Sequence, residues 1–163
     1  MSAYTRTQRL LALPLLVLLL AAALVAASVV TAGEAQAASQ KQIRKATTVA
    51  KNQIGDPYSY GAEGPNAFDC SGLTYFAYKK VGISLPRSSD AQYRFVRGIR
   101  KENIRKGDLM FLHGSSGVYH VGIFVGWDSG RRVILHSPNS GSTVHRQRMW
   151  TGSWWAGTLR PKG

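Results

Sequence analysis

The sequence has very little cysteine and few acidic residues. Cys70 is the only cysteine among 163 residues, so the chain cannot form an internal disulfide and is not a disulfide-stapled secreted scaffold. Asp and Glu together number 8, against 21 Lys and Arg. His, Cys and carboxylate residues are nowhere spaced as closely as the ligands of a metal usually are. We therefore expect no metal and no other cofactor.

Residues 1–37 have the composition of a secretory signal peptide. Arg6 and Arg9 precede an apolar run from residue 10 to residue 27, and small residues at 35 and 37 suit cleavage after Ala37. We expect a secreted, cell-wall-associated protein. The apolar run is also long enough for an uncleaved membrane anchor, which is the alternative interpretation.

The remaining residues, 38–163, suffice for one domain with a hydrophobic core. The formal charge of the whole chain is +13, and its Lys and Arg residues form no clustered basic helix or nucleic-acid-binding motif. Nucleic acid is therefore not an expected partner. An exported protein this basic is attracted to polyanions, so we expect a monomer that binds anionic cell-wall polymers or, alternatively, lipid headgroups.

Hydrophobic periodicity predicts helices first and strands afterwards. The first helix spans 39–54 and stops at Gly55, the second begins after Asp69 and ends near 81–82, and a short third spans about 90–96. The expected strands are 109–112, 118–127, 132–136, 142–149 and 154–159, with hairpin turns at 128–130 and 138–141. This order predicts an α+β domain with N-terminal helices packed on a five- to six-stranded antiparallel sheet.

Cys70 lies in the first turn of the second helix, directly after the expected N-cap Asp69. A thiol at this position feels the positive end of the helix dipole, which favours the nucleophilic thiolate. The small residues Ser71 and Gly72 leave the sulfur approachable. Cys70 is therefore a candidate nucleophile, although an unpaired cysteine is more often a small buried hydrophobe.

His120 opens the most apolar strand, residues 120–126. Alternation places it on one face with Gly122 and Gly126, whose missing side chains leave room for a helix or a substrate. If the helix of Cys70 packs on that face, thiol and imidazole can meet. An ordinary half-buried strand histidine is the alternative.

His136 ends the following strand, and a hairpin between the two strands would bring it near His120. A nucleophile, a base and a group that orients the base would then lie together, as in catalytic triads.

Five segments resemble the NlpC/P60 family of cell-wall cysteine peptidases and occur in that family's order: 57–61, 68–73, 107–111, 120–126 and 135–138. The resemblance implies a papain-like α+β fold. It also implies hydrolysis of peptidoglycan stem peptides, typically at the γ-D-glutamyl to diamino acid bond.

The resemblance assigns roles to six residues. Cys70 is similar to the nucleophile, His120 to the base and His136 to the third polar residue. We expect Cys70 to attack as a thiolate paired with a His120 imidazolium. The residues similar to those that shape the substrate site are Tyr58, Asp69 and Ser71. Glu63 departs from the family pattern where many members have glycine, which affects the rim of the site. His113 and His145 match no motif and are interpreted as surface residues.

Three other functions remain open from the sequence. The same cysteine and histidine chemistry could cleave the amide between muramic acid and alanine, or could transfer acyl groups. The protein could also be an inactive wall-binding module, although such a module has no use for the three catalytic residues.

Overall fold

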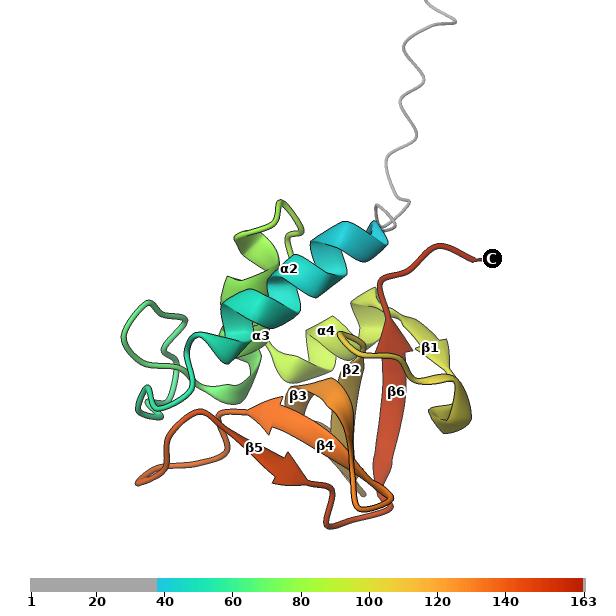
Figure 1. The fold of residues 1–163 in the computed structure, drawn as a ribbon. Helices are drawn as coiled ribbons and strands as arrows, with labels where there is room; N and C mark the ends of the chain where they lie inside the picture. The colour runs from blue at the N-terminus through green and yellow to red at the C-terminus, as the bar shows by residue number, and fades with distance from the viewer. Residues whose placement is uncertain (1–37, 163) are drawn as a thin grey trace, which may run out of the picture. The chain divides into compact units, whose positions relative to one another are not determined.

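The computed structural model describes residues 38–162, and the signal peptide expected at 1–37 lies outside them. In the described part of the chain, α2, α3 and α4 lie together over one side of a curved sheet (Figure 1). No helix among these residues is long and apolar enough to cross a membrane.

Each helix begins at a side-chain cap. The three helices are α2 Gln40–Lys51, α3 Cys70–Lys79 and α4 Ser89–Phe95. Ser39 forms a capping box with Gln42, and Asp69 and Ser88 each accept from a first-turn N–H group. The first helix ends earlier than predicted, because residues 52–55 form a turn that leaves Ile54 45% exposed.

The sheet has six antiparallel strands in the order β1-β6-β2-β3-β4-β5. Their bounds are β1 Arg97–Ile99, β2 Leu109–Gly114, β3 Gly117–Asp128, β4 Arg131–His136, β5 His145–Arg148 and β6 Trp154–Thr158. The predicted α+β class is therefore confirmed. The edge strand β1 and the short 3-10 helix η1 Lys101–Asn103 were not predicted, because three-residue segments carry too little periodicity.

The predicted hairpin turns connect β3 to β4 and β4 to β5. Ser129 and Gly130 both have positive φ, as the tight turn between β3 and β4 requires. Strand β5 is shorter than predicted because the residues before it pair with the loop after α2 instead of with β4. The Tyr58 N–H donates to the Ser142 carbonyl at 2.9 Å, and Val144 N–H to that of Asp56 at 2.8 Å.

The sheet buries apolar side chains on both faces. Leu73 and Ala77 of α3 pack with Val121 and Ile123 of β3, whereas Phe124 packs in a second cluster that contains no residue of α3. The body of α3 thus packs on the face of Val121 and Ile123 and not on that of Gly122, while the thiol at the start of the helix lies against the Val121 N–H, next to His120. A Cβ at Gly122 would lie 2.5 Å from the Ile134 side chain and 2.8 Å from the Leu135 carbonyl oxygen, so strand β4 fills the space left by that glycine.

Candidate active site

Cys70 is the first residue of α3, and its neighbours are held tightly. Asp69 Oδ1 accepts from the Gly72 N–H at 2.7 Å, which caps the helix. A Cβ at Gly72 would lie 2.0 Å from the Ala62 carbonyl oxygen. The small size of Gly72 therefore allows the loop of residues 56–67 to approach the start of α3.

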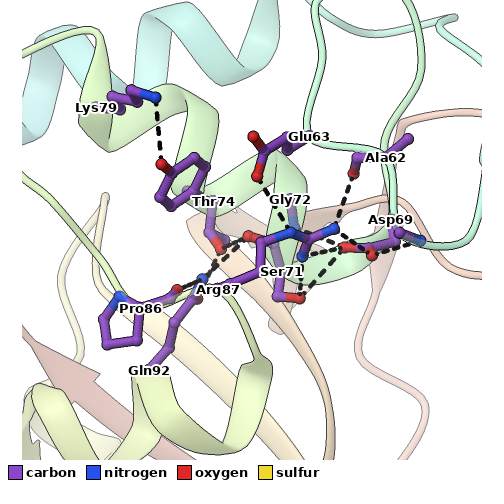
Figure 2. A network of polar contacts seen from close by, with 12 residues as sticks. Ala62, Glu63, Asp69, Ser71, Gly72, Thr74, Lys79, Pro86, Arg87 and Gln92 are labelled. Atoms are coloured by element: carbon purple, nitrogen blue, oxygen red, sulfur yellow. Dashed lines mark hydrogen bonds and ion pairs between the residues drawn. The ribbon is translucent and has the colours of Figure 1, made fainter.

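Arg87 joins that loop to the helix start (Figure 2). Its guanidinium donates to both oxygens of Asp69, at 2.6 and 3.0 Å, and to Ser71 Oγ at 3.0 Å. Its Nε lies 3.3 Å from the Glu63 carboxylate. The departure from the family pattern at Glu63 thus supplies a second acidic partner for Arg87.

The carboxylate of Asp69 is ionised within this network. Burial would raise its pKa, but hydrogen bonds from Arg87 and Gly72 outweigh burial, and the pKa is lowered. Including the Gly61 N–H at 2.9 Å and the Ser71 hydroxyl, five donors reach its two oxygens. A carboxylate has about four lone-pair sites, so its acceptor capacity is fully used.

Gln92 anchors α4 against the same end of α3. Its buried amide donates to the carbonyls of Ser71, at 3.0 Å, and Pro86, at 2.9 Å, and accepts from Thr74 Oγ1 at 2.7 Å. Sequence reasoning missed Arg87 and Gln92. Both lie in or next to a segment that reads only as a loop and a short helix, and their partners are distant in the chain.

His120 and His136 form a buried pair on the sheet side of the site. The Nε2 atom of His120 lies 2.9 Å from Nδ1 of His136, and His136 Nε2 lies 3.1 Å from Gln147 Oε1. Burial lowers the pKa of His120 to about 4. Burial, followed by the nearby His120 and His145, lowers the pKa of His136 to about 3. Both rings are therefore neutral at pH 7.

The thiol of Cys70 is also neutral at rest. Burial has the largest effect and raises its pKa, the Val121 N–H next to His120 partly opposes it, and the Asp69 charge raises the pKa further. Burial therefore opposes the expected thiolate and imidazolium ion pair in the unliganded protein, and that pair stays a prediction. Within residues 38–162 no hydrogen bond joins Cys70 to His120, a contact that in many enzymes tightens only with substrate bound.

Tyr58 lies close to the thiol. Its pKa is raised by burial, then by Cys70 and Asp69. Ser137, directly after His136, donates to the Phe68 carbonyl at 2.7 Å and so joins the end of β4 to the start of α3. The structure thus brings all six sequence-predicted site residues into one region.

The two remaining histidines, which match no family motif, are half-buried. The ring of His145 meets that of His136 edge-on, with centroids 5.0 Å apart, and Trp150 packs on His136 from another side at 5.6 Å. His113 stacks on Trp155 at 3.8 Å. Among the described residues, no group of three His, Cys, Asp or Glu side chains could hold a metal ion.

Residues 55–161 match the model of the NlpC/P60 family. The chain belongs to this family. The resemblance read from the sequence motifs is therefore confirmed, and the protein is a member of a cysteine peptidase family.

Individual relatives agree with this assignment. A "Probable endopeptidase" of Corynebacterium glutamicum strain R is 42% identical over 114 residues, covering 69% of this chain and 51% of the relative. Murein DD-endopeptidase MepH of Escherichia coli K12 is 37% identical over 123 residues, covering 69% and 44%. This chain spans about half the length of these two relatives.

A solved structure carries the same fold as this NlpC/P60 domain. The P60 domain of an antigen from Mycobacterium avium subspecies paratuberculosis superposes with a TM-score of 0.66 at 28% identity, covering 76% of this chain and 98% of that one. The predicted papain-like fold is therefore confirmed.

Proposed function

We propose that this protein is a peptidoglycan endopeptidase that cleaves stem-peptide amide bonds with Cys70 as the nucleophile. The observation that carries the proposal is the position of the Cys70 thiol. It lies at the start of α3, against the Val121 N–H of β3, and Val121 directly follows His120 of the buried histidine pair. Membership of the family and the endopeptidase names of the relatives support the reaction class.

The reaction begins from the neutral pair. His120 Nδ1, the ring nitrogen not engaged by His136, accepts the thiol proton while the sulfur attacks the peptide carbonyl carbon. The carbonyl oxygen becomes an oxyanion, and the Cys70 N–H in the first turn of α3 is a suitable donor to it. The tetrahedral intermediate then expels the amine, which takes the proton from the His120 imidazolium.

The second half-reaction releases the acyl group. Water attacks the thioester carbonyl, gives a proton to His120, and the thiolate leaves and recovers that proton. His136 holds the His120 ring in position throughout. We propose that Asp69 and Ser71 act by fixing the loop and the helix start, since the carboxylate and the buried hydroxyl are already bonded to Arg87, while Tyr58 faces the substrate.

The scissile bond has two candidates. The family resemblance supports the γ-D-glutamyl to diamino acid bond within one stem. The name of the Escherichia coli relative supports a D,D bond instead, as found in cross-links. Cleavage between muramic acid and alanine and acyl transfer are the other outcomes of the same chemistry.

We propose further that residues 1–37 direct export and that exposed Lys and Arg residues bind anionic wall polymers. The support is the composition of the leader and the charge of +13.

Digestion of purified sacculi, followed by mass spectrometry of the products, tests the function. Fragments cut at the γ-D-glutamyl bond are the expected result, and Cys70→Ala should release none while still binding walls. Cleavage of cross-links would reassign the scissile bond to the D,D bond. Release of intact stem peptides without glycan would reassign it to the amide between muramic acid and alanine. Release of fragments by the Cys70→Ala variant at the native rate would overturn the cysteine mechanism.

A further inference from the structure

Gln147 lies at the far end of the histidine pair, on the edge strand β5. Cross-strand register pairs it with Ile134 and pairs His136 with His145. Gln147 and His136 therefore share one face of the sheet, whereas Arg146 and Arg148 lie on the other. On that shared face Gln147 Oε1 lies 3.1 Å from His136 Nε2.

The amide oxygen determines where the protons of the pair are held. An amide oxygen only accepts, so His136 Nε2 must carry a hydrogen. A neutral imidazole has one N–H group, so His136 Nδ1 is an acceptor and His120 Nε2 must be the donor across the 2.9 Å contact. His120 Nδ1 is then left with a free lone pair, which is the state that can accept the thiol proton.

If the hydrogen bond between His120 and His136 ran in the opposite direction, His120 could not act as a base. If a donor replaced the amide oxygen, His136 Nδ1 would carry the hydrogen and donate to His120 Nε2. His120 would then be protonated at Nδ1 and could not accept a proton from Cys70. The same distances are therefore compatible with an active and an inactive proton arrangement, and the group at position 147 selects between them.

We propose that Gln147 is a positioning residue that sets the direction of the His120–His136 hydrogen bond and so makes His120 a base. This inference rests on the proposed function, since it describes how the same site is prepared for attack. Gln147 acts through His136 and touches neither the thiol nor the base.

No side chain at hand replaces Gln147 in this role. The titratable groups facing His136 are His120 on β3 and His145 on β5, and Trp150 covers another side of the ring. His145 Nδ1 already faces the Thr143 carbonyl at 2.7 Å. The contact with the Gln147 amide thus remains the only side-chain hydrogen bond that His136 makes with a group other than His120 in the described part of the chain.

Two substitutions of Gln147 distinguish a role in setting the direction of the hydrogen bond from a role in packing against His136. Gln147→Met removes the acceptor at similar size, and Gln147→Glu keeps an obligatory acceptor. On a soluble stem peptide at pH 7, Gln147→Met should lower kcat about 10-fold or more with little change in KM, and Gln147→Glu should restore kcat to within about 3-fold. The Glu charge should also move the acidic limb of the kcat profile to higher pH. Arg146→Gln, on the opposite face of β5, is the matched control and should match the native rate.

If the Gln147→Met and Gln147→Glu variants both kept the native kcat, the proposal would be overturned. An equal loss in both variants would overturn it too, since a failure of packing predicts that loss and a directional role does not.

Histidine tautomers give a readout that needs no substrate. Long-range proton–nitrogen NMR of the native protein should find both His120 and His136 protonated at Nε2, and Gln147→Met should change the His136 tautomer population. A native His136 protonated at Nδ1 would overturn the inference whether or not the protein cleaves peptidoglycan. Conversely, expected tautomers in a protein that cleaves no sacculi would overturn the proposed function alone.

Discussion

Two polar networks meet at the start of α3, and they differ in charge. On the helix side, the Arg87 guanidinium is paired with two carboxylates, Asp69 and Glu63. On the sheet side, His120, His136 and Gln147 form a chain with no formal charge at pH 7. The first network fixes backbone segments, and the second holds a proton acceptor ready.

The separation of the two networks has a chemical consequence. A carboxylate in place of Gln147 would raise the pKa of the histidine pair and narrow the pH range in which His120 is free to take the thiol proton. Asp69, the carboxylate nearest the thiol in sequence, has its charge paired with Arg87. Charge is thus used where geometry must be rigid, and is avoided where a proton must move.

The largest contrast is expected within the neutral network. His120→Ala should lower kcat/KM by about 10³-fold because the general base is lost. His136→Gln should cost only about 10-fold, since another polar side chain can still orient His120. Steady-state rates on a soluble stem peptide measure both, with His113→Gln as the control. Similar losses in the two variants would show that His136 does more than orient the ring.

Breaking the charged network should affect stability before chemistry. Arg87→Met leaves the buried Asp69 carboxylate without its cation, which should lower the free energy of unfolding by about 2 kcal/mol, a value discounted for the partial exposure of Arg87. Arg94→Met breaks an exposed pair with Asp90 and should cost about 0.5 kcal/mol or less. Urea unfolding of the two variants measures the difference, and equal costs would mean that the Arg87 pair stabilises little.

The sequence predicted part of each network and missed one member of each. Cys70 and Asp69 were found from a helix start, and His120 and His136 from strand ends, because local patterns mark both positions. Arg87 lies 18 residues from Asp69, and no periodicity signals an ion pair at that separation. Gln147 was missed for the same reason, since its role depends on the register between β4 and β5.

Protonation states were the least predictable property of the site. The position of Cys70 at a helix N-terminus was predicted from the sequence, but how deeply the thiol is buried depends on packing between distant segments. Burial proved the largest effect on the pKa of Cys70. The face of β3 that receives α3 was likewise decided by packing, because Val121 and Ile123 are better core residues than the glycines beside them.

The two networks should lose their stabilising effect in different pH ranges. The histidine pKa values are lower in the folded protein, about 4 and about 3, than the ordinary 6.5, so the unfolded chain binds more protons below pH 6.5. Stability from neutral His136 is therefore fully present above pH 6.5 and falls as the pH drops towards the folded values. The stabilisation that comes from the lowered pKa of Asp69 is present above its ordinary value of 3.8 and is lost only as the pH falls below that value.

Unfolding free energies at pH 7 and pH 4.5 test this separation. The native protein should lose roughly 2 kcal/mol per buried histidine over this range, and His136→Gln should lose correspondingly less. Arg87→Met should show the native pH dependence. A native free energy that does not change between these two pH values would mean that the histidines are not held neutral.

The smallest effect on catalysis should come from salt. Both networks are buried or partly buried, so ions screen them weakly, whereas exposed cations such as Arg131 and Arg146 are fully open to screening. Raising the salt from about 0.05 to 0.5 M shortens the screening length severalfold, so adsorption to isolated walls should fall at least about tenfold. Hydrolysis of a soluble stem peptide should change less than about twofold. The double variant Arg131→Gln, Arg146→Gln should weaken adsorption at low salt and leave peptide hydrolysis unchanged. If salt suppressed adsorption and hydrolysis equally, exposed charge would have to act at the site itself, and the division between structural charge and neutral chemistry would fail.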